Sequence, residues 1–144
     1  MSIDLSKRWL SRIPTQLELN GINPQKHRCL VGDVFDWLNR LKRRGESFNL
    51  VILDPPSTSV GKTKRRWSVK RDYGELVALA APLVAPGGAM MTSTNYRQMN
   101  AYQLAKKVQQ DIPTDFVLER VCAPPIDFPA ECLEIKNLIW RRRF

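Results

Sequence analysis

Apolar residues along the chain form either short unbroken runs or stripes spaced three to four residues apart. The clearest run, residues 50–53, ends in an acid and two prolines: Asp54, Pro55 and Pro56. A short apolar run bounded by turn-forming residues is typical of a buried strand of a parallel sheet. Proline has no N–H for the ladder, so the strand ends before Pro55 and presents Asp54 at its carboxyl end. An ordinary Asp-Pro turn is the alternative interpretation.

The same patterns divide the rest of the chain into strands and helices. Ser6 and Asp33 are suited to cap helices, and Pro14 should kink the first helix or start its second part. Trp9 falls on that helix's apolar face and is expected in the core, as is Tyr73 in the third helix. The predicted strands cover residues 2–4, 27–31, 49–54, 89–93, 116–121 and 135–140, and the predicted helices cover about 6–20, 34–44, 73–84 and 101–108.

Strands that alternate with helices predict an α/β fold, with a mostly parallel, Rossmann-like sheet and helices on both faces. The last two strands have no helix between them, so one should run antiparallel near one edge. A tight turn is expected at residues 86–88, and residues 57–68 should form a loop. A length of 144 residues without a linker-like segment predicts one domain over residues 1–144.

Charge narrows the choice of partner. The chain has 23 Lys and Arg residues against 14 Asp and Glu, a net charge of +9. Such an excess favours an anionic partner, usually nucleic acid, and an unspecialised basic surface is the alternative. The predicted loop concentrates these charges beside an aromatic residue, and its candidate RNA-binding residues are Lys62, Lys64, Arg65, Arg66 and Trp67. A merely solvated loop is the competing interpretation.

Other features exclude several classes of protein. No apolar run approaches the ~20 residues that cross a membrane, and no signal-peptide pattern occurs at the start of the sequence. The 3 cysteines are few, odd in number and without metal-site spacing. We therefore expect a reduced, cytoplasmic protein that binds neither membrane nor metal.

Three acids, Asp4, Asp33 and Asp54, follow three successive predicted strands. The carboxyl ends of parallel strands meet at one edge of the sheet, where α/β proteins bind their ligands. One such acid is weak evidence because strand ends often carry Asp as a helix cap, but three in register predict a nucleotide-like ligand. A dehydrogenase domain binding NAD is disfavoured, because no glycine fingerprint is present.

Five segments in order and at matching spacing, residues 3–6, 17–21, 32–35, 53–56 and 85–88, resemble class I S-adenosylmethionine-dependent methyltransferases. Within that superfamily they are most similar to the large-subunit ribosomal RNA methyltransferases that make 5-methylcytosine or 7-methylguanine. The resemblance implies that S-adenosylmethionine is the cofactor and that RNA, ribosomal RNA in particular, is the substrate.

The resemblance also implies roles for individual residues. Asp4 would bind the ribose hydroxyls of the cofactor, Asp33 the adenine amino group, and the Val34 N–H a ring nitrogen. Asp54, Pro55 and Pro56 would line the pocket between the methyl donor and the target base.

Two departures from the family pattern limit what the resemblance implies. Asn95 stands about where the cytosine-C5 enzymes carry a nucleophilic cysteine, so methylation of a base nitrogen or another target is favoured over covalent C5 chemistry. Nothing in the chain matches the family's first strand and glycine-rich loop.

The sequence is therefore expected to be the C-terminal part of a longer methyltransferase, an alternative-start product or a degenerate copy. We expect weak or no cofactor binding by the chain alone, unless self-association or a partner fills the place of the missing central strand. A non-catalytic RNA-binding or assembly module is the alternative function.

Overall fold

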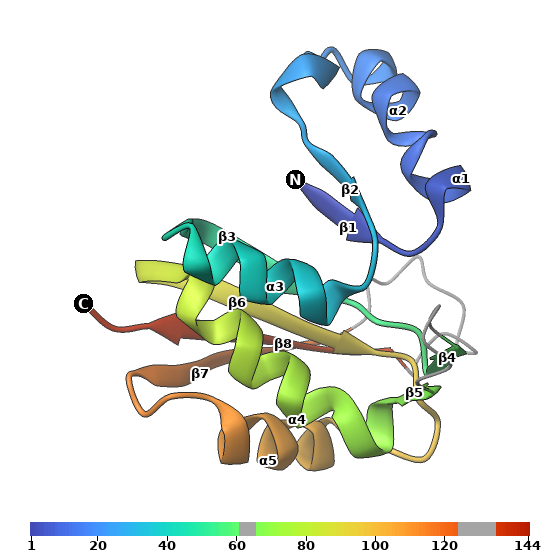
Figure 1. The fold of residues 1–144 in the computed structure, drawn as a ribbon. Helices are drawn as coiled ribbons and strands as arrows, with labels where there is room; N and C mark the ends of the chain where they lie inside the picture. The colour runs from blue at the N-terminus through green and yellow to red at the C-terminus, as the bar shows by residue number, and fades with distance from the viewer. Residues whose placement is uncertain (61–65, 124–134) are drawn as a thin grey trace.

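The computed structural model describes residues 1–60, 66–123 and 135–144 (Figure 1). The predicted order of strands and helices is present. The strands are β1 (Ser2–Asp4), β2 (Cys29–Val31), β3 (Phe48–Leu53), β4 (Thr58–Val60), β5 (Arg66–Ser68), β6 (Val84–Thr94), β7 (Phe116–Cys122) and β8 (Lys136–Arg142), and the helices are α1 (Lys7–Leu10), α2 (Ile13–Leu19), α3 (Val34–Arg43), α4 (Val69–Ala80) and α5 (Ala101–Asp111). Short 3-10 turns precede β2 and β6.

The main sheet has four strands in the order β3-β6-β8-β7. β3 and β6 are parallel, and β8 runs antiparallel to both β6 and β7. A second, two-stranded sheet pairs β1 with β2 in parallel, with Asp4 opposite Val31. The predicted α/β fold with a mostly parallel arrangement and an antiparallel strand near one edge is therefore confirmed.

Between the two sheets, two strand edges have no partner. Within the described residues, β1 pairs only with β2, and β3 pairs only with β6. Leu50 and Ile52 of β3 are 56% and 58% exposed, so this strand is less buried than its apolar run predicts. The break falls where the resemblance predicts an additional central strand.

Helices α3, α4 and α5 lie together on one face of the four-stranded sheet, whereas α1 and α2 lie beside the β1–β2 pair (Figure 1). Tyr73 and Val77 of α4, Leu104 of α5, and Met90 and Trp140 of the sheet form the centre of the core, each at most 1% exposed. Among the described helices, none has the length and apolar character needed to cross a lipid bilayer.

Two local expectations need correction, and a third is confirmed. The turn expected at residues 86–88 lies within the longer strand β6, where the register against β3 shifts between Phe48 and Leu50 and Gly87 adopts a φ of 73°. The loop expected at residues 57–68 contains the antiparallel β4–β5 hairpin, whose three-residue strands are too short to show alternation. The first helix is two helices, and Pro14 lies in the first turn of α2, as its predicted role of starting a second part requires.

Candidate active site

A cleft of about 710 Å³ lies at the carboxyl ends of the strands. Its walls come from the ends of β1, β2, β3 and β6 and from the segments that follow them. The residues predicted for the cofactor and the target base all line it: Asp4, Asp33, Val34, Asp54, Pro55, Pro56 and Asn95. The structure therefore brings together side chains that are up to 91 positions apart in the sequence, as Asp4 and Asn95 are.

The acids that follow β1 and β2 are held by backbone N–H groups. Asp4 Oδ1 accepts a hydrogen bond of 2.6 Å from the Ser6 amide, and Asp33 Oδ1 accepts one of 2.9 Å from the Phe35 amide. Asp33 is the N-cap of α3, as its sequence position predicts. Each carboxylate is thus fixed at the cleft wall while presenting acceptor oxygens there.

Gly32 makes the turn from β2 into Asp33 possible. Its φ is 150°, and a Cβ at this position would lie 2.7 Å from Nε1 of Trp37. That indole nitrogen donates a hydrogen bond of 3.2 Å to the Val31 carbonyl. A side chain at residue 32 would therefore displace Trp37 and shift the Asp33 wall of the cleft.

The segment after β3, Asp54 to Pro56, forms a shelf along the cleft; we call these three residues the shelf. The indole nitrogen of Trp67 donates a hydrogen bond of 2.8 Å to the Pro56 carbonyl. Just beyond, the Ser57 hydroxyl donates one of 2.9 Å to Asn95 Oδ1. These bonds tie the shelf to the β5 strand and to the segment that follows β6.

Tyr73 supports the shelf from beneath. Its buried hydroxyl donates a 2.8 Å hydrogen bond to the Ser93 carbonyl and lies 3.4 Å from the Leu53 carbonyl. Burial raises the pKa of this phenol well above its usual value, and the nearby charge of Asp54 acts in the same direction. The expected core position of Tyr73 is correct, and the hydroxyl additionally spans the ends of β3 and β6.

The predicted RNA-binding loop is only partly described. Lys62, Lys64 and Arg65 lie outside the described residues, and Arg66 is exposed at the start of β5. The Trp67 ring is 9% exposed and packs between Phe35 and Tyr73, with ring centroids 5.9 and 6.4 Å away. Trp67 also lines the cleft. Its stacking on an RNA base stays a prediction, and the burial of the ring against two aromatic side chains argues against it.

Trp9 differs from its prediction in the opposite direction, because it is exposed rather than buried. The apolar pattern predicts it in the core, but it is 59% exposed and lines the cleft, whereas the next residue, Leu10, is 4% exposed. The missed signal is the break between α1 and α2 at residues 11–12, because a broken helix does not continue one apolar stripe.

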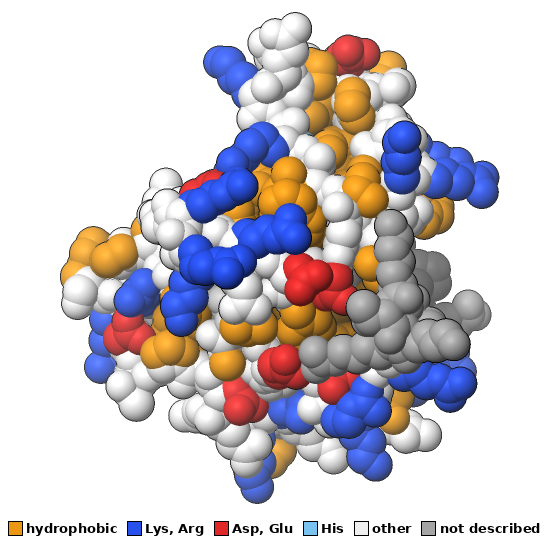
Figure 2. Space-filling model, in the orientation of Figure 1, with side chains coloured by type: hydrophobic (Ala, Val, Ile, Leu, Met, Phe, Trp, Pro, Cys, Tyr) orange, Lys and Arg blue, Asp and Glu red, His pale blue; other side chains and the backbone are white. Residues whose placement is uncertain are grey.

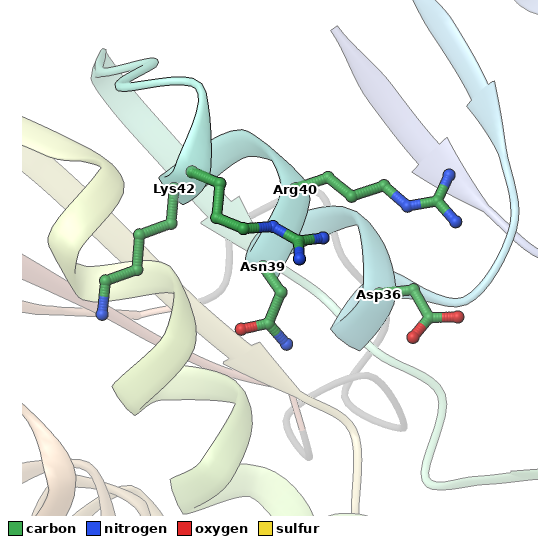
Figure 3. A pocket seen from close by; sticks show the side chains of 5 residues that line it. Asp36, Asn39, Arg40 and Lys42 are labelled. Atoms are coloured by element: carbon green, nitrogen blue, oxygen red, sulfur yellow. The ribbon is translucent and has the colours of Figure 1, made fainter.

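A second hollow, of about 640 Å³, lies along the exposed side of α3 (Figure 3). All its lining residues belong to that helix: Asp36, Asn39, Arg40, Lys42 and Arg43. The side chains of Arg40 and Lys42 extend away from each other (Figure 3). Positive charges in the last turn of a helix interact favourably with the helix dipole, so these cations stabilise α3. We assign no chemistry to this hollow.

Across the described residues, no group of three His, Cys, Asp or Glu side chains could hold a metal ion.

The comparison with protein families matches residues 1–141 to one family, described as S-adenosylmethionine-dependent methyltransferase. Among curated proteins, the chain is 32% identical over 128 residues to the ribosomal RNA large subunit methyltransferase K/L of Saccharophagus degradans, covering 88% of this chain and 16% of that protein. It is 31% identical over 123 residues to the ribosomal RNA large subunit methyltransferase K of Neisseria meningitidis, covering 80% of this chain and 35% of that protein.

Among solved structures, the fold is similar to that of SMU.776, which is described as a methyltransferase and was crystallised with SAH. The TM-score is 0.86 at 25% sequence identity, over 97% of this chain and 38% of that one. The chain spans less than two fifths of the length of each of these three proteins.

Proposed function

Because the chain belongs to the S-adenosylmethionine-dependent methyltransferase family, we propose that its cleft takes part in methyl transfer from S-adenosylmethionine to a base in RNA. The observation that carries the proposal is the single cleft formed by Asp4, Asp33, Asp54 and Asn95 at four strand ends. The activity for which the two curated relatives are named supports ribosomal RNA as the substrate.

The residues at the first two strand ends fit the nucleoside part of this cofactor. Asp4 and Asp33 present carboxylate acceptors at the cleft wall, and ribose hydroxyls and an adenine amino group are donors. In the proposal, Asp4 binds the ribose, Asp33 the amino group, and the backbone N–H of Val34 a ring nitrogen. S-adenosylmethionine supplies a methyl group activated by its sulfonium.

The shelf and Asn95 face the other end of the cleft and are proposed to hold the target base. Asp54 is exposed there, directly after the end of β3, so its carboxylate can also border the cofactor and accept a proton or hydrogen bond from a base nitrogen. Pro55 and Pro56 keep the shelf stiff, and the Asn95 amide is oriented by Ser57. Alignment and exclusion of water are the main contributions of these residues.

Asn95 also bears on the type of target. Its side chain lies at the cleft, and an amide is not a nucleophile for covalent attack on cytosine C6. This supports a base nitrogen as the methyl acceptor in the proposal.

The test measures S-adenosylmethionine binding by calorimetry and transfer of a radiolabelled methyl group to ribosomal RNA. Asp54→Asn should reduce transfer at least tenfold, and Asp36→Asn on α3 is the matched control because it removes the same charge outside the cleft. Equal transfer by the protein and by Asp54→Asn would contradict the role of the shelf.

A second function, a non-catalytic RNA-binding or assembly module, is favoured by one observation. Among the described residues, the facing edges of β1 and β3 have no partner, so part of the cofactor site depends on a strand that pairs with both and that the described residues do not supply. RNA binding by the chain without micromolar S-adenosylmethionine binding would support this alternative. Micromolar cofactor binding by the chain alone would exclude it in favour of the enzyme.

A further inference from the structure

Trp9 is an exposed aromatic side chain at the entrance of the cleft. It is 59% exposed, compared with 9% for Trp67 and 1% for Trp140. Leu10, 4% exposed, attaches α1 to the rest of the protein, so the indole of Trp9 contributes little to the core. A single exposed apolar side chain is ordinary on a protein surface, but this ring also lines the cleft, which makes it available to a bound molecule.

Three cations, Lys7, Arg8 and Arg12, lie within three positions of Trp9 in the sequence. The Arg12 guanidinium lies 4.7 Å from the centroid of the Trp9 ring, and Lys7 and Arg8 of α1 are exposed. Among the described residues, no carboxylate forms an ion pair with any of these three cations. Figure 2 shows Lys and Arg side chains gathered at the α1 end of the molecule.

Aromatic rings between cations are a recurrent means of binding single-stranded RNA, because the ring stacks on a base while the cations approach the phosphates. S-adenosylmethionine is a poor match for the same surface, since it carries a net positive charge. Trp9 and the shelf line one cleft, so one RNA strand that crosses this cleft can contact both.

We propose that Trp9 is a stacking platform for an unpaired base of the RNA strand that carries the methylated one, with Lys7, Arg8 and Arg12 approaching the phosphates of the stacked nucleotide. This inference rests on the proposed function. It gives to Trp9, on α1, the stacking role predicted for Trp67 on the β4–β5 hairpin (Figure 1).

The test compares Trp9→Ala and Trp9→Phe with the unmodified chain, using a single-stranded oligoribonucleotide of mixed sequence. Trp9→Ala should weaken binding about tenfold, the range typical for removal of one stacked base, and should leave the salt dependence unchanged because no charge is removed. Trp9→Phe should retain most of the affinity. Tyr102→Ala is the matched control, because Tyr102 is 75% exposed on α5 and does not line the cleft.

Tryptophan fluorescence gives a second readout. RNA should quench the emission of the unmodified chain, and most of that quenching should be absent in Trp9→Phe. Equal RNA affinity of the unmodified chain and Trp9→Ala would overturn this inference and leave the proposed function intact. Quenching of Trp9 by SAH alone, with RNA affinity unaffected by Trp9→Ala, would also overturn it. Failure of the unmodified chain to bind RNA would overturn both this inference and the RNA part of the proposed function.

Discussion

The indole nitrogen of Trp67 lies 2.8 Å from the carbonyl oxygen of Pro56 and donates a hydrogen bond to it. Neither Pro55 nor Pro56 has an N–H, so the shelf cannot be held by strand pairing in the usual way. Side chains replace the missing ladder: Trp67 holds the far end, and Tyr73 lies below the strand end at Leu53. The position of Asp54 therefore depends on two buried aromatic residues, Trp67 and Tyr73.

Trp67→Phe should keep the ring packing but lose the bond to Pro56. We expect the free energy of unfolding to fall by about 1–2 kcal/mol, and the Ser57 amide to exchange its hydrogen faster because the shelf is less constrained. Trp140→Phe is the matched control, since it loses an indole hydrogen bond of 3.0 Å to Thr92 inside the sheet. Denaturant unfolding and amide exchange measured by NMR would check both, and equal exchange at Ser57 in the two variants would contradict the support role.

Tyr73 should make stability fall at alkaline pH. Its pKa in the folded state is raised by burial, whereas the unfolded chain releases the phenol proton near pH 10. The contribution of the protonated Tyr73 phenol to the free energy of unfolding is therefore fully present below about pH 10, and it is lost as the pH rises toward the pKa in the folded state. Denaturant unfolding at pH 8 and pH 11 should show a smaller alkaline loss for Tyr73→Phe than for the unmodified chain, and parallel losses would refute the assignment.

The cleft was the most predictable part of the molecule. When strands and helices alternate, the carboxyl ends of the parallel strands lie at one edge of the sheet. Asp4, Asp33 and Asp54 could therefore be assigned to one site from their positions in the sequence alone. The resemblance to the methyltransferase family added Asn95 after β6, and all four line the cleft. Their roles in binding and catalysis stay predictions.

The two tryptophans could not be assigned in this way. Trp67 is buried because the β4–β5 hairpin folds its ring onto Phe35 and Tyr73, a contact between segments more than 30 residues apart in the case of Phe35. Trp9 is exposed because α1 is only four residues long, so helical periodicity does not determine its environment. Local pattern and charge predict neither long-range packing nor the end of a short helix.

The unpaired edge of β3 should promote self-association of the chain. Leu50 and Ile52 are more than half exposed there, and an exposed apolar edge strand is a template for pairing with another chain. Ile52→Lys should shift the chain toward monomer at high concentration, as measured by analytical ultracentrifugation. Leu19→Lys on α2, where Leu19 is 75% exposed, is the control. A chain that remains monomeric at every concentration would contradict this prediction.

The basic segment before Trp67 should contribute charge to RNA binding, whether or not Trp67 stacks on a base. Replacing Lys64, Arg65 and Arg66 with Gln should weaken binding and reduce the salt slope by about 0.7 for each phosphate that is no longer neutralised, or about 2 in total for a single strand. Replacing Arg40, Lys42 and Arg43 of α3 removes the same charge outside the cleft and should leave the slope nearly unchanged. The measurement is RNA affinity at several salt concentrations. Equal reductions in both triple variants would show that net charge alone, and not the segment before Trp67 in the sequence, attracts the RNA.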